Sequence, residues 1–140
     1  MDGPDAPEVD DESLVTAVVD AYYAAFEAGD LDGLSDLWVH DDAVSCTHPG
    51  WARLQGWGAV AASYFAIFDR SPPLQVFVTD QTVHVAGDVA WVTLDENLLG
   101  AASEPGGTTV ATVKLLRRTA DGWRFVGHHG SVVVARPDEE

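Results

Sequence analysis

The chain has 140 residues, of which 46% are hydrophobic, and 23 Asp and Glu against 7 Lys and Arg give a formal net charge of −16. This length predicts one domain with a single core. The negative charge repels phosphate backbones and anionic lipid, so we expect neither a nucleic acid nor a membrane as partner. We expect a cytoplasmic protein, because no apolar run approaches the roughly eighteen residues of a membrane helix and no export pattern opens the chain.

The two ends of the chain differ in composition from the rest. Residues 1–12 are rich in acidic residues and proline, and residues 136–140 read the same way. Both segments are predicted to be disordered tails. A single domain is therefore expected over residues 13–135.

Three helices are predicted in the first half of the domain. The first begins with Ser13 as N-cap and ends at Gly29, and its apolar residues recur every four positions, at Leu14, Val18, Tyr22 and Phe26. Asp30 caps a short second helix with an apolar stripe of Leu31, Leu34 and Trp38. A third helix is expected from about Trp57 to Phe68, with Val60, Tyr64 and Ile67 on one side. The first two helices are predicted to form one covering layer.

Strands account for most of the remaining sequence. The segment AVSCTH, residues 43–48, predicts a brief strand, and four long strands follow from residue 74 onward, joined by turns at 86–88, 104–107 and 119–122. The order α-α-β-α-β-β-β-β predicts an α+β fold in which a curved antiparallel sheet wraps around the N-terminal helix layer. Such a cone-shaped fold leaves an open-ended internal cavity, where ligands bind.

Several sequence strings, in this order, resemble the nuclear transport factor 2-like superfamily, whose fold is a cystatin-like α+β cone, and in particular its SnoaL-like branch. They are AYYAAFEAGDLDGLSDLW, DDAVSCTHPGW, ATVKLLRR and DGWRFVGHHGS. The resemblance covers about residues 13–135 and implies the cone-shaped fold. It does not fix an activity, because the superfamily includes isomerases, cyclases, dehydratases, transport factors and oligomerisation modules.

A comparison with ketosteroid isomerase, a more distant relative by resemblance, suggests site residues. Tyr22 matches the tyrosine of that enzyme's oxyanion hole, and His48 stands where its catalytic aspartate precedes a proline. The second member of the hole, a protonated aspartate, falls near Lys114, where no acidic residue is present. The resemblance thus implies a catalytic or binding role for Tyr22 and His48, but not the isomerase's own arrangement.

The histidines offer the clearest acid and base candidates. Pro49 biases His48 toward an extended backbone at a strand exit, and a histidine at a pocket rim titrates near neutrality. Strict alternation places His129 with Trp123 and Phe125 on the face assigned to the cavity. His128 then falls on the outer face, unless a bulge reverses the assignment. His48, His129 and Tyr22 are the predicted catalytic residues.

Four further side chains are predicted to contact a ligand. They are Trp51, Tyr64, Asn97 and Trp57. The two tryptophans flank a loop near the expected cavity mouth and can stack on a flat ligand, although Trp57 also fits the description of a lid over the third helix. Asn97 belongs to a polar triplet in the middle of a strand, in which Asp95 and Asn97 face one way and Glu96 the other.

No metal and no cofactor are expected. Cys46 and His48 share one face of their strand and could be joined by His129, but a catalytic zinc site requires three protein ligands with supporting groups around them, and the sequence has no close-spaced pair such as HExxH. The sequence also has no phosphate loop, nucleophile elbow or dinucleotide-binding motif.

Two functions remain open at this stage. The first is a pocket for a small apolar or carbonyl-containing molecule, with cofactor-free isomerase, cyclase or lyase chemistry carried by histidine acid and base groups. The second is a non-catalytic module that dimerises through the outer sheet face, as the resemblance to the association domain of calmodulin-dependent kinases suggests. A homodimer is compatible with both.

Overall fold

The protein is described by a computed structural model that covers residues 10–70, 74–100 and 107–134. Its elements, in chain order, are α1 (Asp11–Ala28), α2 (Leu31–Ser35), β1 (Ser45–Thr47), β2 (Leu54–Gln55), α3 (Trp57–Arg70), β3 (Leu74–Ala86), β4 (Val89–Gly100), β5 (Thr108–Thr119) and β6 (Gly122–Val132). Of the tails predicted at residues 1–12 and 136–140, residues 1–9 and 136–140 lie outside the described residues, as does most of the turn predicted at 104–107, whereas Asp11 and Glu12 belong to α1 and not to a tail.

The first helix begins earlier than its sequence pattern indicated. Its N-cap is Asp10, whose carboxylate accepts a hydrogen bond from the Ser13 backbone N–H, so the assignment of Ser13 as N-cap was wrong. Gly29 ends α1 in the left-handed conformation (φ 64°), as predicted. Asp30 caps α2 through the N–H of Gly33, also as predicted.

The buried face of α1 is rotated from the expected stripe. Val15, Val19 and Tyr22 are buried, whereas Leu14 is 42% exposed. Two residues four positions apart differ in direction by about 40° around the helix axis. A series of residues spaced by four therefore turns away from the buried face within a few turns of the helix. The same rotation brings Tyr23 into the core beside Tyr22.

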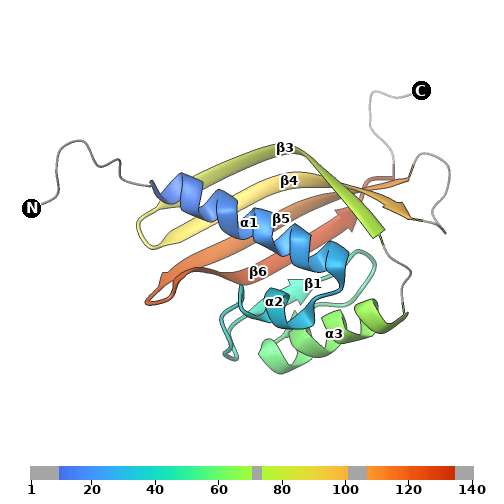
Figure 1. Cartoon of the computed structure of the whole chain (residues 1–140), viewed down its shortest axis with the longest axis horizontal. Helices are drawn as coiled ribbons and strands as arrows, with labels where there is room; N and C mark the ends of the chain where they lie inside the picture. Colours follow the sequence, from blue (N-terminus) through green and yellow to red (C-terminus); the bar gives the residue numbers. More distant parts are fainter. Residues whose placement is uncertain (1–9, 71–73, 101–106, 135–140) are drawn as a thin grey trace, which may run out of the picture.

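The six strands form one curved, unclosed sheet in the order β2-β1-β6-β5-β4-β3. In Figure 1 the four long strands curve behind α1. They pair antiparallel, as predicted, but β1 pairs parallel with β6. The two-residue strand β2 was not predicted, because such a short segment has no detectable alternation.

Two β-bulges interrupt the regular alternation of the sheet. In β3 the register shifts between Thr79 and Thr82, where Asp80 has a positive φ of 56°. In β6 the residues that pair with Leu115 and Leu116 are Gly127 and Phe125, which leaves Val126 as the extra residue. A bulge bends its strand and shifts every later side chain to the other face.

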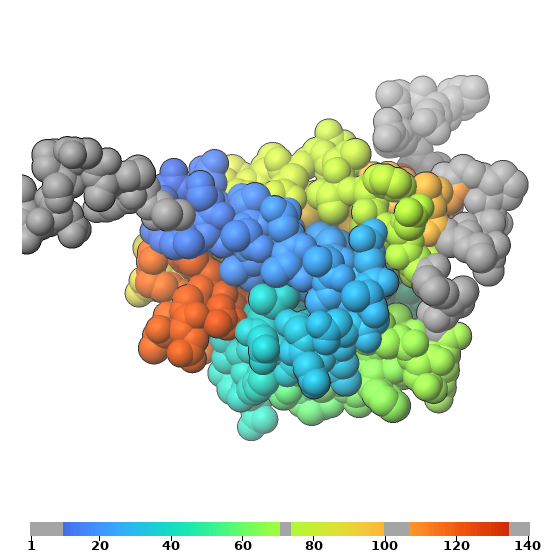
Figure 2. All heavy atoms as spheres, viewed as in Figure 1, coloured from blue at the N-terminus to red at the C-terminus, as the bar shows by residue number. Residues whose placement is uncertain are grey.

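The helices cover one face of the sheet. Figure 2 shows α1, α2 and α3 side by side on one face of the molecule, in blue, cyan and green. The core between helices and sheet includes Val15 and Val19 of α1, Leu34, Val92 and Leu116. Within the described residues no helix combines the length and apolar character required to cross a membrane.

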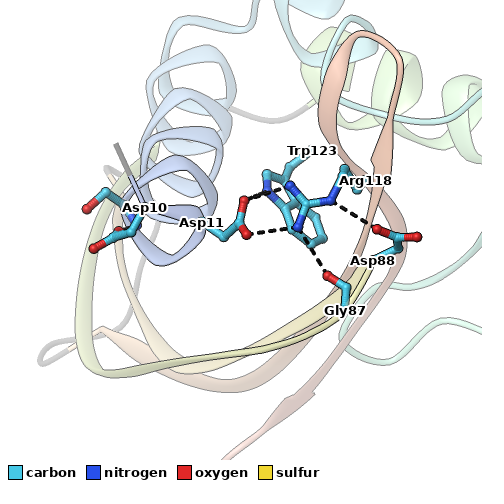
Figure 3. Close-up of polar contacts among 7 residues, drawn as sticks. Asp10, Asp11, Gly87, Asp88, Arg118 and Trp123 are labelled. Carbon is cyan, nitrogen blue, oxygen red and sulfur yellow. Dashed lines mark hydrogen bonds and ion pairs between the residues drawn. The ribbon is translucent and has the colours of Figure 1, made fainter. Parts of the chain in front are cut away.

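A polar clamp fixes the start of α1 to the end of the sheet where two hairpins meet. The Arg118 guanidinium donates two hydrogen bonds to the Asp11 carboxylate, at 2.7 and 2.8 Å, and one to Asp88 at 3.0 Å (Figure 3). The Trp123 indole N–H donates to Asp11 as well, at 3.2 Å. The clamp therefore joins α1, the β3–β4 turn, β5 and β6.

Candidate functional site

A cavity of about 170 Å³ lies between α1, the loop after β1, α3 and the inner face of the sheet. Five polar side chains line it, namely Tyr22, Tyr23, His48, Glu96 and His128. The remaining lining residues are Phe26, Pro49, Trp51, Ile67, Leu74, Val76 and Leu98. The cavity is therefore mostly apolar, with a few polar groups, which is the usual composition of a small-molecule pocket.

His48 is held in a defined protonation state. It follows β1, is 5% exposed, and its Nε2 lies 2.8 Å from the Ser63 hydroxyl oxygen. Since that hydroxyl donates its own proton to the Val60 carbonyl at 2.6 Å, it accepts from His48 Nε2–H. Burial lowers the pKa of His48 to about 4, helped by the nearby charge of Lys114. At neutral pH His48 is therefore uncharged, with Nδ1 as its basic nitrogen.

His128 is the same tautomer as His48, but its other ring nitrogen has the protein partner. Its Nδ1 lies 3.0 Å from Nζ of Lys114, and the side chain is 6% exposed. Burial holds the pKa of His128 well below its ordinary value, and the Lys114 charge lowers it further. An ammonium group can only donate, so Nδ1 accepts and the remaining nitrogen, Nε2, carries the proton.

Lys114 is fully buried on the inner face of β5, next to the cavity. Its Nζ lies 3.4 Å from the centre of the Tyr22 ring and 4.9 Å from that of Tyr23. Burial lowers the pKa of Lys114 to about 8, against the opposing effect of the Glu96 charge. Lys114 is thus protonated in most molecules at neutral pH, and its charge lies against the faces of aromatic rings.

The tyrosines add hydroxyl groups to the site. The Tyr22 and Tyr64 hydroxyls form a hydrogen bond of 2.8 Å, and burial raises the pKa of both. Tyr23 donates to Glu96 at 2.5 Å, and burial raises its pKa too. All three phenols are therefore neutral hydrogen-bonding groups over the physiological pH range. Tyr64 lies behind Tyr22 and is not among the cavity-lining residues, contrary to its expected ligand contact.

The structure brings together three of the predicted site residues, Tyr22, His48 and Trp51, at one cavity. The ring centres of His48 and Trp51 are 4.9 Å apart, and Trp51 is 43% exposed at the rim. The ring centres of His48 and His128 are 6.2 Å apart. One small molecule in the cavity can therefore reach both imidazoles.

The placement of His129 in the cavity was wrong. His129 is exposed and pairs with Val113 on the outer face, whereas His128 is buried and lines the cavity. The cause is the extra residue Val126, which reverses the alternation after Phe125. Phe125 and His128 consequently share the inner face.

Two other predicted ligand contacts also lie elsewhere. Asn97 faces outward, where its amide donates to the Phe77 carbonyl and to Thr79 and accepts from Thr109. Trp57 stacks on His40 with ring centres 4.5 Å apart and packs against the core instead of lining the cavity. Trp57 therefore has the covering role that was its alternative interpretation.

No group of three or more potential metal ligands occurs within the described ranges of the chain. Cys46 lies 3.6 Å from Nε2 of His48, but burial raises the pKa of its thiol to about 11. A thiol must lose its proton to bind a metal, so this pair is poorly prepared for one.

Sequence reasoning missed four residues of the site, namely Tyr23, Glu96, His128 and Lys114. A signal for two of them was present. Lys114, the chain's one lysine, and Glu96 both stand at inward positions of strands whose other inward residues are apolar or small. A charged residue at such a position is costly to bury, which marks it as a candidate for function.

Comparison with known proteins agrees with this fold. The family model of the SnoaL-like domain matches residues 15–135. The F-box protein SKIP8 of Arabidopsis thaliana is 26% identical over 104 residues, which are 74% of this chain. The chain spans 43% of the length of that plant protein.

Two solved structures are similar over almost their whole length. One is a candidate dehydratase of the NTF2-like family from Streptomyces avermitilis, 42% identical, with a TM-score of 0.82 and coverage of 89% of this chain and 97% of that one. The other is a candidate calcium/calmodulin-dependent protein kinase type II association domain from Thiobacillus denitrificans, 36% identical, with a TM-score of 0.77 and coverage of 85% and 94%. The resemblance predicted from the sequence is confirmed, and the chain belongs to the family of SnoaL-like domains within the NTF2-like proteins.

Proposed function

We propose that the cavity binds a small carbonyl-containing molecule and transfers a proton on it, as a cofactor-free isomerase or lyase. One observation carries the proposal: two neutral imidazoles line the same cavity, with ring centres 6.2 Å apart, and the nitrogen that each leaves without a protein partner differs, Nδ1 in His48 and Nε2–H in His128. One offers a lone pair and the other an N–H, so a carbon acid can lose a proton to the first while its oxygen is held by the second.

Each polar group has a distinct role in this proposal. His48 Nδ1 is the base that takes a proton from the carbon next to the carbonyl. His128 Nε2–H donates to the carbonyl oxygen, taking the place expected for His129. The Tyr22 hydroxyl, hydrogen-bonded to Tyr64, orients the same oxygen. The apolar walls exclude water, which strengthens both hydrogen bonds.

An isomerase and a lyase share this first proton transfer. An isomerase returns the proton to another carbon, whereas a lyase expels a leaving group from the neighbouring carbon. The likeness to a candidate dehydratase at 42% identity favours the lyase, in which a hydroxyl group leaves as water after receiving a proton. The assignment to this chain is a proposal, since that description belongs to the Streptomyces protein.

Ligand binding is tested by thermal unfolding with a matched pair of compounds, the small ketone 2-indanone and the hydrocarbon indane. A ligand that binds the folded state raises the melting temperature. We expect a larger increase with the ketone, loss of that difference in His128→Ala, and its retention in His129→Ala. Equal increases with ketone and hydrocarbon in the wild-type protein would contradict recognition of the carbonyl group.

A second candidate function, assembly through the outer sheet face, rests on a different observation. Large apolar side chains are exposed on this face, including Phe77 (51%), Trp91 (38%), Val113 (41%) and Leu115 (44%). Trp91 and Leu115 are cross-strand partners, so they form one continuous patch. A patch of this kind is typical of a protein interface. We propose that two copies of the chain pair there, which leaves the cavity free.

A further inference from the structure

Lys114 places a positive charge directly behind one wall of the cavity. It is fully buried, and its recorded hydrogen-bond partner is Nδ1 of His128, at 3.0 Å. Within the described residues no carboxylate lies within ion-pair distance of Nζ. Burying a cation is costly unless other groups offset its charge, so the surroundings of Lys114 need an explanation.

The groups that face Lys114 offset this charge only in part. From α1, the Tyr22 and Tyr23 rings present their negative faces, with centres 3.4 and 4.9 Å from Nζ. From β4, Glu96 acts through its charge without contact, and its carboxylate accepts the Tyr23 hydroxyl. On the remaining sides, Cys46 and the two imidazoles of His48 and His128 carry no negative charge at neutral pH. A negatively charged ligand group in the cavity would offset the rest of the Lys114 charge.

We propose that His128 and Lys114 together bind the anionic oxygen of a planar, delocalised ligand, an enolate or a phenolate. Lys114 donates to Nδ1 and so fixes the proton on Nε2, which donates to the ligand oxygen. The positive charge behind the ring strengthens that hydrogen bond, because a charge-assisted bond is about twice as strong as a neutral one. The apolar remainder of the cavity fits the flat carbon frame of such an anion better than a fully hydrated carboxylate.

This inference deepens the proposed function and rests on it for the placement of the ligand oxygen. Lys114 is a positioning residue, since it acts through His128 and is not among the residues that line the cavity. In the proposed reaction the enolate is the species formed when His48 removes the proton. The pair would therefore stabilise the intermediate more than the neutral carbonyl compound.

The test compares para-nitrophenol, a substantial fraction of which is ionised at neutral pH where Lys114 keeps its charge, with its neutral isostere para-nitrotoluene. We expect the wild-type protein to bind the phenolate at least about tenfold more tightly than the isostere, which is the effect of one charge-assisted hydrogen bond. Lys114→Met should abolish this preference without weakening binding of para-nitrotoluene. Val92→Ala is the matched control, because Val92 is the buried cross-strand partner of Lys114 and carries no charge.

Two measurements on the wild-type protein keep the test independent of whether Lys114→Met folds. The absorbance of bound para-nitrophenol should titrate at lower pH than in free solution, and the nitrogen-15 shifts of His128 should show protonation at Nε2. Binding of the neutral phenol in preference to the phenolate, or a proton on Nδ1, would overturn the inference. Neither measurement depends on proton transfer from a ketone. The anion-binding role of Lys114 and His128 and the proposed reaction are therefore tested separately.

Discussion

The folded protein favours the neutral form of His48, which is buried and hydrogen-bonded to Ser63. The free energy of unfolding therefore depends on pH. Its pKa is about 4 in the folded protein, against about 6.5 in an unfolded chain. Between these values the unfolded chain binds the additional proton, so the free energy of unfolding falls as the pH decreases. We expect His48 to account for a loss of about 3 kcal/mol between pH 7 and pH 4.

Denaturant unfolding of the wild type and of His48→Gln over this pH range measures how much His48 contributes to the pH dependence of the free energy of unfolding. The variant should lose much of the acid-side decrease, because glutamine can still donate to Ser63 but does not titrate. His84→Gln serves as control, since His84 is an exposed histidine of β3. An identical decrease in wild type and His48→Gln would contradict the assigned protonation state.

The site residues differ in how far the sequence could predict them. Tyr22 and His48 line the cavity as expected. The resemblance to ketosteroid isomerase implied both, and the Pro49 that follows His48 supported it independently. His128 could not be chosen over His129, because a single unpaired residue at Val126 decides which of them faces inward. Gly127 and Gly130 mark this strand as a place where a bulge can occur, but they do not show that one does.

At the scale of elements, the clamp at Arg118 holds the start of α1 against the sheet (Figure 3). The guanidinium binds Asp11 with two hydrogen bonds and also lies 4.6 Å from the centre of the Trp123 ring. We expect Arg118→Met to lower the melting temperature and to speed hydrogen exchange in the first turn of α1. Because these charges are partly solvent-exposed, salt should reduce the difference between variant and wild type.

The neighbouring Arg117 provides the control for this prediction. Within the described residues it has one ion pair, with Asp41, at 3.8 Å, and both side chains are close to half exposed. Arg117→Met should therefore change the exchange of the first turn of α1 very little. Equal effects of the two variants would show that general surface charge, and not the clamp, governs this end of the helix.

The order and boundaries of the long elements follow from the sequence more completely than the site does. Helical periodicity, Gly29 and the turn around Gly87 predicted α1, α3 and the four long strands to within a few residues. The parallel pairing of β1 with β6 could not be predicted, because it depends on how the chain returns across the sheet after α2. The same long-range pairing places His48 beside His128.

At the scale of the whole molecule, the two faces of the sheet have different proposed roles. The inner face closes the cavity, and the outer face exposes the patch around Trp91 and Leu115. We expect the protein to sediment as a dimer at micromolar concentration and Leu115→Lys to sediment as a monomer, because each copy would bury an unpaired lysine in the apolar interface.

The cavity should be unaffected in that variant, since Leu115 faces away from it. Leu115→Lys is therefore expected to keep the ketone-dependent increase in melting temperature. The matched variant Arg53→Lys replaces one exposed cation by another outside the sheet face and should remain dimeric. A monomeric wild-type protein over the whole concentration range would contradict the proposed pairing.

Deuterium exchange measures directly whether His48 takes a proton from a carbonyl compound held in the cavity. Proton NMR in deuterated buffer follows the loss of the hydrogens next to the carbonyl of 2-indanone. We predict that the wild type and His129→Gln accelerate the exchange above the buffer rate, and that His48→Gln slows the catalysed exchange by at least about a hundredfold. Exchange at the buffer rate with the wild type, or equal catalysis by His48→Gln, would contradict the account.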